Sequence, residues 1–98
     1  MSPSWAKRID ANQNDVVKGL RKVGASVCIL SSMGKGVPDL LVGYQCKNFA
    51  IELKDGDKTE LEQQLTEDEK KWHLSWKGQV SVCNALLECY YLIGVLKK

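Results

Sequence analysis

The chain has 98 residues and a mass of 11.0 kDa, enough for one domain over residues 1–98 but not for a second hydrophobic core. With 44% hydrophobic and 27% charged residues, its composition excludes a disordered, collagen-like or coiled-coil chain. The longest apolar run, residues 89–96, is far shorter than the roughly 20 residues that span a bilayer, and residues 1–8 lack a signal peptide's apolar stretch. We therefore expect a cytoplasmic protein without membrane association.

The cysteines give no sign of a metal site or of a disulfide framework. Cys28, Cys46, Cys83 and Cys89 form no CxxC pair, and His73 is the only histidine. A tetrahedral zinc site would therefore need an unusual set of ligands. Because the chain also has enough Val, Ile and Leu to build a core, we expect reduced thiols.

Charge is distributed in three blocks that the net charge of +2 conceals. Residues 1–54 carry eight Lys or Arg against four acids, residues 55–69 carry one against seven, and residues 70–98 carry five against one. The two basic blocks can neutralise phosphates along a polyanion, although solvated surface lysines are the commoner explanation. The candidate DNA contacts are Lys7, Arg8, Lys35 and Lys47, and Lys18, Arg21 and Lys22 are further candidates.

The first predicted element is a helix over residues 10–23. Its apolar positions recur at helical spacing, and Gly24 follows where a left-handed residue ends a helix. At 100° per residue Gln13 falls near the middle of the apolar stripe, whereas Asp15 points to the opposite side. We expect Gln13 to face inward.

Three strands follow, over residues 25–31, 39–43 and 49–54. The MGKGVP segment between the first two is a loop by its glycines and proline, and residues 44–48 form a turn. Apolar residues alternate with Ala50, Glu52 and Lys54 in the third strand. Glu52 and Lys54 should therefore share one face of the sheet.

The second half of the chain completes an α/β fold. After an acidic loop over residues 55–65, Thr66 and Glu69 match a capping box that opens a helix through about residue 76, and Gly78 ends it. A strand over residues 79–83 and a helix from residue 85 to near Lys98, capped by Asn84, come last. The order αβββαβα predicts a mixed central sheet flanked by helices. The last helix is apolar on nearly every side, which predicts a homodimer through this helix.

One group of side chains points to chemistry. If the second and third strands are neighbours, Asp39 and Glu52 converge at the edge of the sheet with Lys54 beside them. Two carboxylates suit Mg²⁺, and the backbone carbonyl of Leu53 can supply another oxygen. A metal there can activate water against a phosphodiester, and Lys54 can orient that water or offset the developing charge. The plainer alternative is a solvated Glu–Lys ion pair.

Two segments, GKGVPDLLVGYQCKNFAIELKDG and LTEDEKKWHLSWKGQV, resemble the VRR-NUC branch of the PD-(D/E)xK nuclease superfamily, of its small stand-alone type from phages and bacteria. The family's motifs fall on Gly36, Pro38 and Asp39, on Glu52 and Lys54, and on Leu65, Thr66 and Glu69. The resemblance implies a restriction-endonuclease-like core and Mg²⁺- or Mn²⁺-dependent hydrolysis of DNA. It also implies homodimers that act on branched DNA such as four-way (Holliday) junctions, in bacterial or phage-infected cytoplasm.

The chain departs from the family at two places. Relatives often have Gln where this chain has Glu69, so that residue either enters the site or serves only as the capping-box acid. The family's first helix usually contributes an acid and a glutamine; Gln13 matches, and the acid is Asp10 or Asp15. The helical wheel favours Asp10, which can equally be an N-cap.

The aromatic residues of the second helix also have two interpretations. Trp72 and Trp76 are most simply core anchors that pack against the sheet. The more specific alternative is that they stack on a base extruded from DNA. His73 is expected to be a packed residue rather than a general base.

We therefore expect a metal-dependent endodeoxyribonuclease with Asp39 and Glu52 as ligands, Lys54 as the catalytic cation and Gln13 in support. The alternative is a non-catalytic module that binds branched DNA or a protein on the same fold. A small dimeric structural protein is a third reading, which DNA binding with a steep salt dependence would exclude.

Overall fold

The computed structural model describes residues 11–97, so Lys7, Arg8 and Asp10 lie outside the described part. The elements are α1 (Ala11–Lys22), β1 (Ser26–Ile29), β2 (Leu40–Tyr44), β3 (Lys47–Leu53), α2 (Glu67–Ser75), β4 (Val80–Cys83) and α3 (Leu86–Ile93). This is the predicted order, and it confirms a mixed α/β fold.

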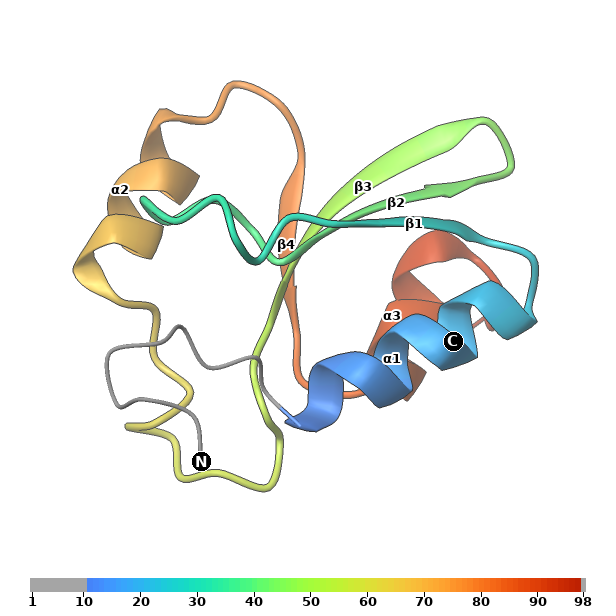
Figure 1. Ribbon diagram of the computed structural model, residues 1–98, viewed down its shortest axis with the longest axis horizontal. Helices are drawn as coiled ribbons and strands as arrows, with labels where there is room; N and C mark the ends of the chain where they lie inside the picture. Colours follow the sequence, from blue (N-terminus) through green and yellow to red (C-terminus); the bar gives the residue numbers. More distant parts are fainter. Residues whose placement is uncertain (1–10, 98) are drawn as a thin grey trace.

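The four strands form one mixed sheet in the order β1-β2-β3-β4 (Figure 1). The first three strands are antiparallel neighbours, whereas β4 pairs with β3 in parallel through the connection that carries α2. The turn between β2 and β3 is shorter than predicted. Gln45 and Cys46 alone form it, both with positive φ (51° and 64°), so that Lys47 and Asn48 already belong to β3.

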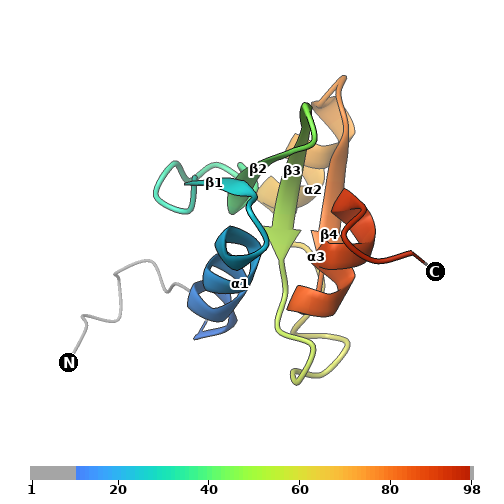
Figure 2. The same cartoon turned by 90° about the vertical axis from the view of Figure 1, so that its right-hand side faces the viewer.

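The hydrophobic core lies between one face of the sheet and helices α1 and α3, which lie next to each other (Figures 1 and 2). The buried β3 residues Phe49, Ile51 and Leu53 face this core, as the alternation predicted. The two helices approach closely at Gly19, where an added Cβ would collide with the Leu86 side chain. A hydrogen bond stabilises this close contact: the Tyr90 hydroxyl donates to the backbone carbonyl of Gly19 at 2.8 Å.

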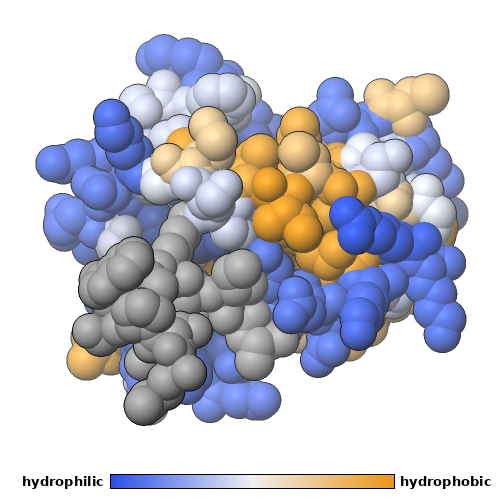
Figure 3. Space-filling model, viewed as in Figure 1, coloured by the Kyte–Doolittle hydropathy of each residue, from blue (hydrophilic) through white to orange (hydrophobic). Residues whose placement is uncertain are grey.

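Helix α2 lies apart from this core and has no buried residue. It lies beside the loop that follows β1, away from α1 and α3 (Figure 1). Figure 3 shows apolar side chains gathered over the strands and a mostly hydrophilic surface around α2. The prediction of core anchors is therefore wrong for Trp76, which is 49% exposed; its ring stacks instead on Trp72, with centroids 4.5 Å apart.

The final helix is shorter than predicted, because Gly94 ends it in a left-handed conformation (φ 94°). The Asn84 side chain does not cap it; the N-cap is Ala85, and Glu88 Oε1 accepts the backbone N–H of Asn84 at 3.0 Å. Cys89 and Ile93 are buried in the chain's own core. Within residues 11–97, none of the helices has the length and apolar character needed to cross a bilayer.

Candidate active site

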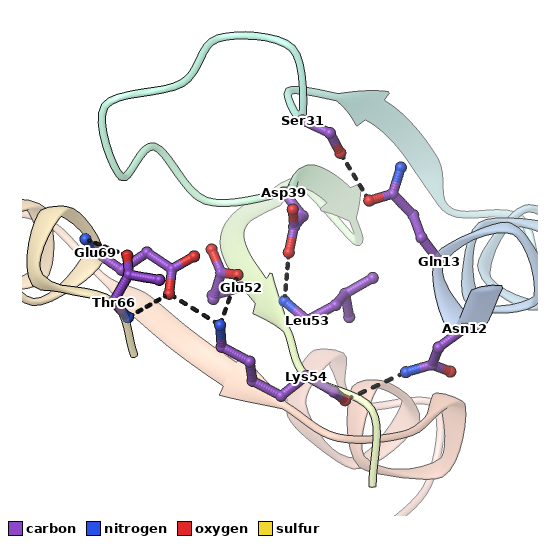
Figure 4. Close-up of polar contacts among 9 residues, drawn as sticks. All are labelled: Asn12, Gln13, Ser31, Asp39, Glu52, Leu53, Lys54, Thr66 and Glu69. Atoms are coloured by element: carbon purple, nitrogen blue, oxygen red, sulfur yellow. Dashed lines mark hydrogen bonds and ion pairs between the residues drawn. The ribbon is translucent and has the colours of Figure 1, made fainter. Parts of the chain in front are cut away.

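Asp39 is fixed where β2 and β3 begin to diverge. It follows the buried Pro38 and directly precedes β2. One step beyond the last β2–β3 pair, Leu40 with Ile51, Asp39 Oδ2 accepts the backbone N–H of Leu53 at 2.8 Å (Figure 4). A side-chain oxygen thus continues the ladder of hydrogen bonds, and it holds the carboxyl group of Asp39 beside β3.

Glu52 projects from the face of β3 opposite the core and is nevertheless only 3% exposed. Its Oε1 is buried and has no hydrogen-bond partner. Burial raises the pKa of Glu52 to about 9, helped by the hydrogen bond and negative charge of Asp39 and by the charge of Glu69, against the opposing effect of Lys54. Two carboxyl groups in such contact need a shared proton or a cation between them.

Lys54 lies on the same face as Glu52, as predicted. Its Nζ is 2.9 Å from Glu69 Oε1 and 3.8 Å from Glu52 Oε2. Burial lowers the pKa of Lys54, but the hydrogen bond to Glu69 and the negative charges of Glu69, Glu52 and Asp39 outweigh it and raise the pKa. The ammonium group is therefore charged and is held beside the two carboxyl groups (Figure 4).

Glu69 is the acid of the capping box and also contacts Lys54. In the capping box its Oε1 accepts the backbone N–H of Thr66 at 2.9 Å, and Thr66 Oγ1 accepts the backbone N–H of Glu69 at 3.2 Å. The same Oε1 accepts from Lys54. Burial raises the pKa of Glu69, but the hydrogen bonds from Lys54 and Thr66 and the charge of Lys54 lower it overall. The start of α2 therefore positions the lysine.

Gly36 brings the loop before Asp39 onto the first turn of α2. Its φ is 82°, in the left-handed region, and an added Cβ would collide with the backbone carbonyl of Asp68. Only glycine satisfies both conditions. The neighbouring Lys35 is exposed on the same loop, with φ 55°.

Gln13 faces inward, as the helical wheel predicted, and is 2% exposed. Its Oε1 accepts from the hydroxyl of the buried Ser31 at 2.7 Å, which ties α1 to the segment that leads to Asp39. Asn12 Nδ2 donates to the carbonyls of Lys54 (3.2 Å) and Asn84 (3.4 Å). No local pattern in the sequence predicts these contacts of Ser31 and Asn12, because both join segments that are distant along the chain.

The remaining candidates do not join this cluster. Asp15 is exposed, as expected for its side of α1. Lys47 pairs with Tyr44 at the hairpin, the opposite end of β3 from Glu52. The exposed residues Lys18, Arg21 and Lys22 lie on α1, where Arg21 donates to the carbonyl of Val27. His73 is half-buried, and its Nε2 has no hydrogen-bond partner.

The donor set fits a hard cation better than zinc. Within residues 11–97 no three side chains among His, Cys, Asp and Glu form a metal-binding group. Mg²⁺ and Mn²⁺ do not need such a cage, because Mg²⁺ is commonly held by one or two carboxylates together with water and phosphate oxygens. The unpartnered Glu52 Oε1 next to Asp39 is an oxygen of this kind.

Comparison with known proteins does not assign a function to this site. No protein-family model, curated protein or solved structure matches the chain.

Proposed function

We propose that the protein is a metal-dependent endodeoxyribonuclease of the VRR-NUC type with a restriction-endonuclease-like core. One observation carries the proposal: two carboxyl groups, Asp39 and Glu52, meet at the diverging ends of two strands with the ammonium group of Lys54 beside them. A merely structural ion pair does not require a second buried carboxyl group or a buried oxygen without a partner. The resemblance of the motifs to those of the nuclease family supports the same conclusion.

The carboxylates of Asp39 and Glu52 and the backbone carbonyl of Leu53 would hold Mg²⁺ or Mn²⁺. When bound, the cation lowers the pKa of a coordinated water and offsets negative charge on the phosphate. Glu52 must lose its proton to bind it, so binding releases a proton and weakens as the pH falls.

Lys54 contributes a fixed positive charge at the phosphate, where negative charge grows during hydrolysis. Glu69 keeps the ammonium group in place through the 2.9 Å contact, and Thr66 keeps Glu69 in place. Gln13 has a supporting role, because its bond with Ser31 fixes the segment before Asp39. Asp10, which lies outside the described residues, is a further candidate ligand.

The proposed substrate is branched DNA, such as a four-way junction, in bacterial or phage-infected cytoplasm. Lys35 lies on the loop that adjoins the start of α2, whereas Lys47 lies at the hairpin, at the other end of β3 from Glu52. Lys7 and Arg8, which lie outside the described residues, are further candidate phosphate contacts. Each phosphate contact adds to the salt dependence of binding.

Cleavage assays with and without Mg²⁺ or Mn²⁺ test the proposal on duplex, single-stranded, flap and four-way-junction DNA. We expect Glu52→Ala and Lys54→Ala each to lower the cleavage rate by about a hundred- to a thousand-fold, which is the usual cost of removing one preorganised group that stabilises the transition state. Glu60→Ala and Lys58→Ala are matched controls, because both side chains are exposed. Cleavage that persists in EDTA or in Glu52→Ala would refute the assignment.

We further propose a homodimer through the last helix. β4 is an edge strand, and residues of β4 and α3 line an open surface pocket of about 360 Å³: Ser81, Val82, Cys83, Glu88, Tyr91 and Leu92. Leu87 on the same helix is 55% exposed. Leu87→Arg should convert the dimer to a monomer in light scattering, whereas Leu61→Arg, at a more exposed leucine, should not. A monomeric wild type at micromolar concentration would contradict this part.

The alternative function is a non-catalytic module that binds branched DNA or a protein. It is favoured by the small number of ligands, since no three metal-binding side chains meet within the described residues. DNA binding without cleavage in either metal, unchanged in Glu52→Ala, would support the module over the enzyme.

A further inference from the structure

The two tryptophans of α2 form a surface that the proposed chemistry does not use. Trp72 and Trp76 stack with their planes 18° apart and their centroids separated by 4.5 Å. Trp72 is half-buried, whereas Trp76 is 49% exposed, although an indole in a single domain of this size is usually covered. Trp76 is also the C-cap of α2, and its backbone N–H is fixed to the carbonyl of Trp72 at 3.0 Å. The exposed ring is thus held by the ring behind it and by its backbone.

Trp76 lies on the same side of α2 as Glu69, whose carboxylate holds Lys54. Trp76 follows Glu69 by seven positions, which corresponds to nearly two full turns of an α-helix and a rise of roughly 10 Å. Successive nucleotides of one strand rise about 3.4 Å along the axis of duplex DNA, and an unpaired, unstacked strand spans more than this per nucleotide. A strand with one phosphate at the carboxyl groups therefore reaches Trp76 within about three nucleotides.

The surface beside the tryptophans is basic. Glu67 and Asp68 lie in the first turn of α2, but no acid follows Glu69 until Glu88. The lysines between them, Lys70, Lys71 and Lys77, are all exposed. Lys70 forms an ion pair with Glu67 at 3.6 Å, so Lys71 and Lys77 are the cations on which the proposal relies. Aromatic rings flanked by cations are the combination with which proteins bind unpaired nucleotides, because any base can stack and the lysines meet the phosphates.

We propose that the Trp72–Trp76 pair is a binding subsite for an unpaired nucleobase, with Trp76 contacting the base and Trp72 supporting it. This inference rests on the proposed nuclease function, because it places the base on the strand that enters the catalytic site. In a continuous duplex the bases already stack on one another, whereas junctions and flaps offer bases that can leave the stack. The subsite therefore gives the protein a preference for branched or single-stranded DNA.

The test measures DNA binding by fluorescence anisotropy in EDTA, so that it does not depend on cleavage. Trp76→Ala removes one stacking contact. It should weaken the binding of single-stranded and flap DNA about ten-fold or more, and the binding of duplex DNA by less than two-fold. Trp76→Phe should restore most of the affinity. Leu74→Ala is the matched control, because Leu74 is the other exposed apolar residue of α2, at 87% exposure, and points away from Glu69.

A second measurement keeps the test valid if Trp76→Ala folds poorly. Abasic nucleotides placed along the single strand should weaken wild-type binding at one or two positions, about three nucleotides from the cut. There the losses from the abasic site and from Trp76→Phe or Trp76→Ala should not add. Equal losses for duplex and single strand, or additive losses at every position, would overturn the subsite. A change in the oligomeric state of the Trp76 variants would also overturn the subsite, because it would show that the indole contacts a second copy of the chain.

The outcomes separate this proposal from the nuclease assignment. Binding that depends on Trp76 without any cleavage in Mg²⁺ or Mn²⁺ supports the subsite and contradicts the enzyme. Cleavage that is indifferent to Trp76 on every DNA structure supports the enzyme and contradicts the subsite.

Discussion

The two faces of the sheet differ in how they are built. On one face α1 and α3 pack against β2 and β3 so closely that an added Cβ at Gly19 would collide with Leu86. On the other face α2 buries none of its residues and reaches the sheet through charged groups, above all the contact of Glu69 with Lys54. The first face supplies the apolar burial that stabilises the fold, and the second holds charges close together at a cost. Stability and the proposed chemistry can therefore be changed separately.

The largest expected effect on stability comes from Ile51, which is fully buried and directly precedes Glu52 on β3. Ile51→Ala should lower the free energy of unfolding by about 2–5 kcal/mol, because it removes apolar contacts and leaves a cavity. Urea denaturation measures the loss. Glu52→Gln, one residue further on the opposite face, should leave the protein fully folded. Similar losses in the two variants would contradict the separation of the faces.

A sharper test uses two glycines of one loop. Both Gly34 and Gly36 have positive φ, but only at Gly36 would a Cβ collide, with the carbonyl of Asp68. Gly34→Ala should cost about 1 kcal/mol from backbone strain alone, whereas Gly36→Ala should cost about 2–3 kcal/mol. Only Gly36→Ala should also lower cleavage, since it separates the loop before Asp39 from α2. Equal effects of the two substitutions on unfolding and cleavage would show that the close approach is unimportant.

The charged face should also make stability depend on pH. The pKa of Glu52 is raised from 4.5 to about 9 in the folded protein, so the folded chain keeps a proton that the unfolded chain releases. The stability contribution of the neutral carboxyl group is complete below about pH 4.5 and is lost as the pH rises towards 9. At pH 8 in EDTA, Glu52→Gln should be more stable than the parent by about 1–3 kcal/mol. Denaturation of the parent and of Glu52→Gln at pH 5 and pH 8 checks this. If the free energy of unfolding changes with pH equally in both proteins, the proton is not on Glu52.

The smallest effects should distinguish the two roles of Glu69. Thr66→Ala removes the acceptor for the Glu69 backbone N–H and should cost about 1 kcal/mol. Glu69→Gln keeps an oxygen for Thr66 and Lys54 but removes the charge, so it should lower cleavage more than stability. Unfolding and cleavage measured together on both variants decide this. Unchanged cleavage in Glu69→Gln, which keeps the cap and loses only the charge, would show that the cap is the main role of Glu69.

Local patterns predicted much of the fold and of the site. The order of elements, the inward Gln13, the capping box of Thr66 and Glu69 and the shared face of Glu52 and Lys54 follow from periodicity and helix-start chemistry. These features depend on neighbours within one or two turns, which the sequence contains directly.

Other features depend on contacts that only the folded chain creates. The hydrogen bond from Leu53 to Asp39, the Ser31–Gln13 bond and the burial of Glu52 join distant segments. Trp76 was predicted in the core because an indole is apolar, but the path of α2 keeps it half-exposed. Asn84 was expected to cap α3 through its side chain, yet its backbone binds Glu88 instead.

The parallel pairing of β3 with β4 has a consequence for folding during synthesis of the chain. The backbone N–H of Lys54 donates to the carbonyl of Cys83 at 2.9 Å, across a connection that contains the whole of α2. Until β4 has been synthesised and has docked, β3 is an edge strand and the lysine lacks this anchor. A nascent chain that does not yet include β4 therefore lacks this support for Lys54, and the proposed activity requires that β4 has been synthesised and paired.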